Sequence, residues 1–221
     1  MERSFVLFMT AIKLARPDEL PEGFLYRGDF LSEAEESKLL EIFPGLDFAA
    51  YDYHGYLAKR RVARFGVNYD INTRELSDVD RPIPDFLLGV RERAAEFAGV
   101  AADSLVQAMV SEYSVGTPIG WHRDAPQFGT IIGISLGSAC RMRLKPYGAV
   151  GSGSSGKLLS IRLEPRSIYV MRGAARSKWQ HSIPAVEHMR YSITFRTLRP
   201  ASRPGTAPTK VQDRAGKLRR G

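Results

Sequence analysis

The chain has 221 residues, of which 43% are hydrophobic and 25% are charged, and this composition argues against both a largely disordered chain and a membrane protein. The length suits one domain with a sizeable core, and no apolar run approaches the roughly 20 residues that span a bilayer. The net charge of +8 favours polyanionic partners, of which nucleic acid is the most abundant.

We expect residues 1–21 to form an N-terminal extension. The opening MERSFVLFMTAIKLA loosely imitates a signal peptide, but Glu2, Lys13 and the lack of a small-x-small cleavage site argue against secretion. The single cysteine, Cys140, cannot form an internal disulfide, which suits a reducing compartment. A cytoplasmic, monomeric protein is therefore expected.

The predicted domain, residues 22–200, begins with a short strand and a helix in FLYRGDFLSEAEESKLLEIF. Ser32 is a good N-cap, and Glu35, three residues later, completes a capping box. A second helix is predicted from about Pro84 to Phe97, where apolar residues recur at helical spacing and Gly99 can end the helix.

From Leu105 onwards, short apolar segments alternate with Gly, Pro and Ser. These segments are LVQAMVSEY, TIIGISLGS, RMRLKP, KLLSIRL, SIYVMRG and RYSITFRTLR. Their spacing predicts an all-β sandwich or barrel supported by the N-terminal helices. The insert GAVGSGSSG is a flexible loop by composition. Residues 201–221 lack apolar periodicity and are expected to form a disordered basic tail that can dock on phosphates.

Three residues are candidate metal ligands. His122 and Asp124 in GWHRDAP are two positions apart, so on an extended chain both project from one face. His181 in KWQHSIP is the remaining histidine on a plausible strand. Two histidines and a carboxylate form a facial triad, which leaves positions on iron(II) open for a co-substrate and oxygen. Alone the triplet is weak evidence, because a hydrogen-bonded histidine and an Asp-Ala-Pro turn also explain it.

The segment RYSITFRTLR strengthens the metal hypothesis. Its alternation places Arg190, Ser192, Thr194 and Arg196 on one face, and the intervening positions are mostly apolar. Two arginines on the inner face of a sandwich need anionic partners, because an unpaired buried charge is costly. A dicarboxylate such as 2-oxoglutarate would provide them. The alternative is a solvated face on an edge strand.

The order His122-x-Asp124, His181, Arg190 and Arg196, preceded by Tyr113, resembles the AlkB-type iron(II)- and 2-oxoglutarate-dependent dioxygenases that dealkylate nucleic acids. The similarity extends over about residues 22–200 and includes FLYRGDFLSEAEESKLL and EPRSIYVMRGAARSKWQHSI. Ordered agreement at many spaced positions is far more specific than one triplet. The resemblance implies a mainly β, α+β fold, the double-stranded β-helix or jelly roll.

The resemblance also implies cofactors and roles. Catalysis would use Fe(II), 2-oxoglutarate and O2. The catalytic iron ligands would be His122, Asp124 and His181. The co-substrate would be held by Tyr113, Arg190, Ser192, Thr194 and Arg196, with Arg190 and Tyr113 at the distal carboxylate and Arg196 at the metal-proximal end.

For the substrate, the stretch YLAKRRVARFGVNYD resembles the nucleotide-facing lid of the family. Its basic residues are Lys59, Arg60, Arg61 and Arg64. We expect this basic stretch, Arg61 above all, to contact phosphates, and Phe65 and Tyr69 to stack on bases. A hairpin with a solvated, charged face is the alternative. Trp121 either packs beneath the site or fills the core.

The expected function is dealkylation of damaged bases in DNA, with RNA as a further possibility. Ser111 stands where repair enzymes often have Asn, and Pro126 and Gln127 stand where they tend to have acidic residues. These departures and the basic tail favour a transfer-RNA hydroxylase as the alternative. An oxygenase that acts on proteins and a non-enzymatic jelly-roll binding module are less favoured.

Overall fold

The structure is a computed structural model that describes residues 19–53, 56–69, 75–77, 81–148 and 158–199. The expected N-terminal extension up to residue 18, most of the Gly/Ser-rich loop and the basic tail lie outside the described residues. No helix in the described part of the chain is long and apolar enough to cross a membrane.

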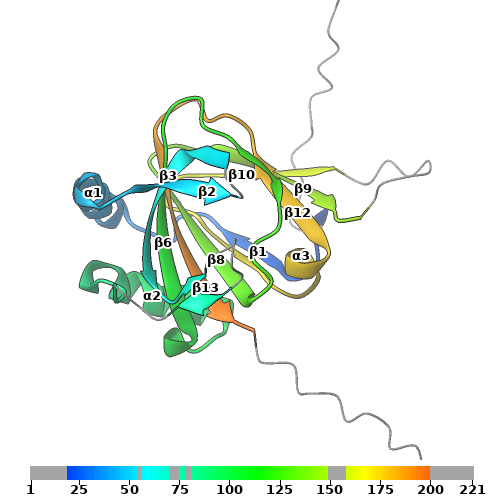
Figure 1. The fold of residues 1–221 in the computed structure, drawn as a ribbon, viewed down its shortest axis with the longest axis horizontal. Helices are drawn as coiled ribbons and strands as arrows, with labels where there is room; N and C mark the ends of the chain where they lie inside the picture. The colour runs from blue at the N-terminus through cyan, green and yellow to red at the C-terminus, as the bar shows by residue number, and fades with distance from the viewer. Residues whose placement is uncertain (1–18, 54–55, 70–74, 78–80, 149–157, 200–221) are drawn as a thin grey trace, which may run out of the picture.

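Two antiparallel sheets form the body of the fold (Figure 1). The larger sheet has seven strands in the order β1-β11-β8-β13-β6-β3-β2, and the smaller has four in the order β10-β9-β12-β7. The larger sheet comprises β1 (Phe24–Arg27), β2 (Ala49–Tyr53), β3 (Tyr56–Gly66), β6 (Leu105–Tyr113), β8 (Phe128–Leu136), β11 (Ile168–Met171) and β13 (Arg190–Leu198). The smaller comprises β7 (Ile119–His122), β9 (Cys140–Pro146), β10 (Leu159–Leu163) and β12 (Trp179–Ile183). A separate pair joins β4 (Asn68–Tyr69) and β5 (Leu76–Ser77).

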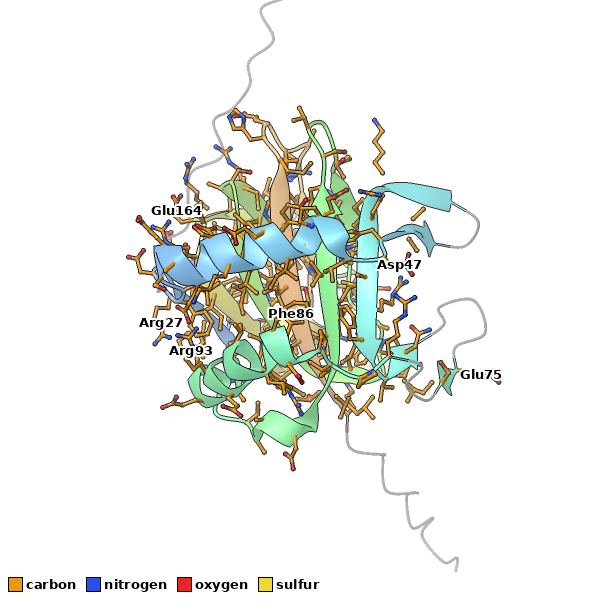
Figure 2. The ribbon with its side chains drawn as sticks, turned by 90° about the vertical axis from the view of Figure 1, so that its left-hand side faces the viewer. Arg27, Asp47, Glu75, Phe86, Arg93 and Glu164 are labelled. Atoms are coloured by element: carbon orange, nitrogen blue, oxygen red, sulfur yellow. The ribbon has the colours of Figure 1, made fainter. Side chains whose placement is uncertain are left out.

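Two helices, α1 (Glu33–Ile42) and α2 (Asp85–Ala98), lie across the larger sheet on the side away from the smaller one (Figure 2). The predicted capping box is confirmed, because the Glu35 amide donates to Ser32 Oγ at 3.2 Å and the Ser32 amide donates to Glu35 Oε2 at 2.9 Å. Gly99 ends α2 in the left-handed conformation, with φ of 65°. Three short helices are η2 (Phe43–Gly45), η3 (Ala102–Ser104) and α3 (Gly173–Ser177).

The larger sheet separates two hydrophobic cores. On the helix side, Leu87 and Phe43 pack against Ile193 and Phe195 of β13. Between the sheets, Leu144 of the smaller sheet belongs to a second core. This is the mainly β, jelly-roll architecture expected from the sequence. The space between the sheets is not apolar throughout, because the inward face of β13 is polar, and there the candidate site lies.

A close contact at Gly133 of β8 shapes this space. A Cβ atom at Gly133 would collide with the ring of Tyr169, which lies on the neighbouring strand β11 directly across from Gly133. Glycine therefore lets the Tyr169 ring lie flat over β8. The ring also stacks on Phe24 with a centroid separation of 5.9 Å.

Candidate active site

The three candidate metal ligands meet at one end of the smaller sheet. His122 is the last residue of β7 and lies directly opposite His181 of the neighbouring strand β12. Asp124 follows two residues after β7. One ligand atom from each of the three lies within 4.8 Å of the others, and His181 Nε2 is 3.8 Å from Asp124 Oδ2. Two imidazoles and one carboxylate at this spacing can share one divalent metal ion.

The protonation states of these groups suit metal binding. Burial lowers the pKa of His181 to about 3, with the neighbouring His122 adding to the effect. Burial likewise lowers the pKa of His122. For Asp124, burial alone would raise the pKa, but Arg196 and the two histidines outweigh it and hold the pKa well below its usual range. Neutral imidazoles and an ionised carboxylate need lose no proton before they bind a metal.

Neighbouring groups orient two of the ligands. His122 Nδ1 is 2.9 Å from the carbonyl oxygen of Gly120, so a protonated Nδ1 leaves Nε2 free for a metal. Arg196 Nη2 donates to Asp124 Oδ1 at 3.1 Å, and its Nη1 donates to Gln107 Oε1 at 2.8 Å. The other carboxylate oxygen, Oδ2, faces His181.

Arg176 of α3 holds the loop that carries Asp124. This side chain is buried, and its Nη2 donates to the carbonyl oxygens of Asp124, Ala125 and Phe128 at 3.1, 2.6 and 3.2 Å. A buried guanidinium that binds three carbonyl groups fixes the path of the loop. The sequence reasoning missed this residue and its helix.

The inward face of β13 has the polar character that its alternation predicts. Arg190, Ser192, Thr194 and Arg196 are all buried. Strand β13 pairs with β6 on one side and with β8 on the other. It is thus an inner strand of the larger sheet, which rules out the alternative of a solvated edge strand.

Arg190 is the most unusual of these residues, because this charged side chain is only 1% exposed and has no acidic partner among the residues that the structure describes. Its guanidinium lies 4.7 Å from the ring centroid of Tyr113, and its Nε donates to Ser135 Oγ at 3.3 Å. Its Nη1 has no hydrogen-bond partner, and no carboxylate in the described part of the chain forms an ion pair with it. Such a group calls for an anion.

A second unsatisfied group lies on the same side of the sheet. Ser111 of β6 is fully buried, its Oγ has no hydrogen-bond partner, and its Cα partner on β13 is Ser192. Tyr113, two residues along β6, is buried beside Arg190. The inner face of the larger sheet therefore offers a buried cation and the free hydroxyl group of Ser111, donors that suit a bound carboxylate.

The expected substrate residues on β3 require a correction. Phe65 is buried in the core beneath the helices and cannot stack on a base. Arg61 lies on this same side, where its Nε donates to Glu112 Oε1 at 2.8 Å and its guanidinium lies 5.5 Å from the ring centroid of Phe48. The side chain of Tyr69 lies outside the described residues.

Arg60 of β3 acts electrostatically on the site. Val62 pairs with Ser111, whose side chain faces the pocket, so the alternation turns Arg60 and Val62 to the pocket side and Arg61 away. The charge of Arg60 contributes to the lowered pKa values of Tyr113, His122 and His181. The lid hypothesis therefore placed Arg61 and Phe65 on the wrong face of β3.

Trp121 lies neither beneath the site nor in the core. His122 faces inward, so its neighbour Trp121 projects from the outer surface of the smaller sheet. There its half-buried ring has Arg143 Cζ at 5.1 Å and Lys145 Nζ at 4.3 Å from the centroid.

Comparisons with known proteins agree with this geometry. Residues 51–196 match the family described as the 2OG-Fe(II) oxygenase superfamily. The chain is 30% identical over 202 residues to the "Alkylated DNA repair protein ALKBH8 homolog" of Arabidopsis thaliana, covering 82% of this chain and 56% of that protein. It is 30% identical over 172 residues to the mouse "tRNA (carboxymethyluridine(34)-5-O)-methyltransferase ALKBH8", covering 75% of this chain and 25% of that protein.

A third relative is matched over most of its length. The "Alpha-ketoglutarate-dependent dioxygenase alkB homolog 7, mitochondrial" of Bos taurus is 32% identical over 167 residues, covering 74% of this chain and 68% of that protein. The fold is similar to that of OsALKBH1, with a TM-score of 0.60 at 14% identity over 80% of this chain and 99% of that one. A Trichoplax adhaerens prolyl hydroxylase gives a TM-score of 0.56 at 13% identity over 80% and 83% of the two chains. The chain spans about half the length of the Arabidopsis relative and a quarter of the mouse relative.

Proposed function

Since the chain belongs to the AlkB-type branch of the 2OG-Fe(II) oxygenase superfamily, we propose that it oxidatively dealkylates damaged bases in DNA. The cofactors of this family are Fe(II), 2-oxoglutarate and O2. When bound, they supply oxygen activation coupled to loss of CO2 from 2-oxoglutarate, and the hydroxylated N-alkyl carbon of the base then leaves as an aldehyde.

The observation that carries the proposal is the convergence of two sets of side chains, one from each sheet, on the space between the sheets. His122, Asp124 and His181 would hold the iron, and the unpaired Arg190 with Tyr113 would hold the distal carboxylate of 2-oxoglutarate. A metal ion would suit the two imidazoles and the carboxylate, and a dicarboxylate would give the buried Arg190 guanidinium its counter-charge.

The residues between these sets would position the reactants. Arg196 keeps the Asp124 carboxylate ionised and turned so that its Oδ2 faces His181. Ser192 and Thr194 line the path from Arg190 to Arg196 along β13. Donors that the fold holds in place would lower the reorganisation needed during the reaction.

The substrate must reach this buried site with its base exposed. A base in a duplex hides its pairing edge, so the enzyme would act on single strands or flip the nucleotide out, which costs a few kcal/mol. The charge of Arg60 at the pocket and the net charge of +8 support an anionic strand as the substrate.

The direct test is turnover on alkylated oligonucleotides. Protein loaded with Fe(II) under anaerobic conditions and then given 2-oxoglutarate and air should form succinate faster when single-stranded DNA with N1-methyladenine is present. The methyl group should be lost in equal molar amount, as read by mass spectrometry. Alkylated DNA that neither accelerates succinate formation nor loses its methyl group contradicts the proposal.

A second candidate, hydroxylation of transfer RNA, is favoured by one observation within the pocket. Ser111 provides a shorter, unsatisfied hydroxyl where the DNA-repair pattern has Asn, and the mouse relative carries a transfer-RNA activity in its name. Mass spectrometry of nucleosides from transfer RNA, compared between a deletion strain and its parent, separates the two candidates. A modified nucleoside that disappears only in the deletion strain supports the second.

A further inference from the structure

The smaller sheet carries positive charge and no negative charge. None of its strands, β7, β9, β10 and β12, contains Asp or Glu. Its cationic residues are Arg141, Arg143, Lys145 and Arg162.

All of these cations project from the outer surface of the sheet. Leu144 is fully buried between the sheets and pairs with the inward-facing His181. The residues on either side of it, Arg143 and Lys145, therefore face outward. Arg162 of β10 pairs with Arg141 of β9, so its side chain points to the same outer face.

Aromatic rings order this charged surface. Arg143 and Lys145 rest against the ring of Trp121, and Arg143 Nε also donates to Ser182 Oγ at 3.0 Å. Just past the end of β9, Tyr147 is 57% exposed, and Arg123 Cζ lies 3.5 Å from its ring centroid. Cations held against rings lose less side-chain entropy when they bind an anion.

This surface adjoins the candidate active site across β7. Arg123 lies between His122 and Asp124 in the chain, and its Nη1 donates to the carbonyl oxygen of Ser177 at 3.1 Å. One side of β7 therefore presents a metal ligand, and the other presents the aromatic and cationic residues. A strand bound on the outer surface would lie beside the rim of the site.

The cations here differ from those on the helix side of the molecule. There, Arg61, Arg81 and Arg93 form ion pairs with carboxylates at 2.6–2.7 Å. On the smaller sheet, Arg162 pairs with Glu164, but Arg123, Arg141, Arg143 and Lys145 form no ion pair with a carboxylate of the described residues. Unpaired cations that lie close together repel one another, and polyanion binding relieves that repulsion.

We infer that this surface binds the nucleic-acid strand that continues from the target base. We call it the basic sheet face and define it as Trp121, Arg123, Arg141, Arg143, Lys145 and Tyr147. The phosphodiesters would contact the cations, and an unpaired base would stack on the exposed side of Tyr147. The inference rests on the proposed function, and its ligand is a single strand, whether DNA or RNA.

The first test measures binding to the metal-free protein, without turnover. Labelled oligothymidylate and oligouridylate of one length are titrated over a range of salt concentrations. The triple variant R141Q/R143Q/K145Q should bind about tenfold more weakly, and the slope of log affinity against log salt should fall by about 2 for three lost phosphate contacts on a single strand. Comparing the two oligonucleotides separates DNA from RNA as the preferred strand.

The matched control removes the same charge from the other side of the molecule. Arg27, Lys38 and Arg81 are exposed and lie away from the smaller sheet, with Arg27 on the helix side (Figure 2). The variant R27Q/K38Q/R81Q should keep the wild-type salt slope. Equal losses in both triple variants would overturn the inference, because net charge alone would then explain binding. Thermal unfolding checks that each variant is folded. If the triple variant is unfolded, the single variants R141Q and K145Q are used in its place.

A second readout places the strand at Trp121. The chain has two tryptophans, so W179F leaves Trp121 as the sole emitter and W121F leaves Trp179. Saturating oligothymidylate should change the emission of W179F, because it draws Arg143 and Lys145 away from the ring, and should leave that of W121F unchanged. Unchanged emission of W179F at saturation would overturn the inference, as would a duplex that competes as well as the single strand.

The two proposals fail in distinguishable ways. Succinate formation with a free alkylated nucleoside involves no flanking strand, so it tests the proposed function and should be equal in the wild type and in R141Q/R143Q/K145Q. If the protein turns over nucleosides and the triple variant binds strands as tightly as the wild type, the proposed role of the basic sheet face is refuted and the proposed function stands. If no alkylated substrate is turned over, the proposed function is refuted, whatever the result of the binding experiment.

Discussion

Arg196 and Asp124 form a hydrogen bond of 3.1 Å that joins the strand of the proposed co-substrate pocket to the proposed metal centre. Both side chains are almost completely buried, and Gln107 accepts a second hydrogen bond from the same guanidinium. Because the carboxylate is held at one oxygen, its other oxygen has a defined direction. The pair therefore makes the geometry of the metal ligands depend on β13.

Replacing Arg196 should weaken metal binding. The Arg196→Met variant keeps much of the stem but leaves Asp124 without its donor, and the loss of such a partner typically weakens metal affinity by about 10–100-fold. Calorimetric titration of the metal-free protein with Co(II) measures the effect. Arg162→Met on the exposed side of β10 is the control. Equal Co(II) affinities in the two variants would contradict the role of Arg196.

Replacing Arg190 should separate ligand binding from stability. Arg190 is buried and has no carboxylate partner within the described ranges, so Arg190→Met should leave the free energy of unfolding of the ligand-free protein unchanged or increase it. The free energy of unfolding of the wild-type protein with Co(II) should rise by about 2.7 kcal/mol when 2-oxoglutarate is present at a hundred times its dissociation constant. In Arg190→Met that gain should vanish, as measured by chemical denaturation.

If 2-oxoglutarate stabilises Arg190→Met as strongly as it stabilises the wild type, the distal carboxylate binds elsewhere. Arg27→Met, at an exposed position, should keep the full gain and so controls for the loss of one positive charge.

Replacing Arg176 should destabilise the loop that carries Asp124. Arg176→Met removes the donor to three carbonyl groups, and we expect a loss of about 2–4 kcal/mol in the free energy of unfolding. Urea denaturation measures the loss. Ser177→Ala in the same helix is the control, because Ser177 Oγ donates within α3, to the carbonyl oxygen of Gly173. A loss no larger than that of Ser177→Ala would show that the loop is held by other contacts.

Adding one methyl group at Gly133 should disturb the pocket through Tyr169. Gly133→Ala places a Cβ against the Tyr169 ring, and such overpacking costs about 1–3 kcal/mol. In the double variant with Tyr169→Ala, the added methyl group should cost much less, which a double-mutant cycle measures.

An exposed helical glycine provides the matched control for Gly133. Gly89 in α2 has open space around its Cβ position, so Gly89→Ala should stabilise the protein by about 0.5–1 kcal/mol. Opposite signs for the two Gly→Ala changes are the expected result. Destabilisation by both would mean that steric crowding at Tyr169 is not the cause.

Local patterns predicted those parts of the fold that depend on neighbouring residues in the chain. The capping box of Ser32 and Glu35 and the end of α2 at Gly99 involve contacts within a few residues. The polar face from Arg190 to Arg196 follows from the two-residue period of a strand. Such features need no knowledge of the tertiary structure.

The remaining errors came from long-range relationships. Which face of β3 meets the pocket depends on its pairing with β6, about 50 residues away, so Arg61 and Phe65 were assigned to the wrong side. Arg176 reaches carbonyl groups that are 48–52 residues away in sequence. Trp121 is different, because the alternation that turns His122 inward would have predicted its outward direction.

The position of β13 within the larger sheet has a consequence for how the pocket behaves in time. Its backbone amides are bonded to β6 on one side and to β8 on the other, so we expect them to exchange with solvent hydrogen only through global opening. The pocket side chains that β13 carries would then persist between encounters with the co-substrate. Ordering these side chains would then cost no binding free energy. Selectivity between substrates would depend on the surfaces around the entrance to the site.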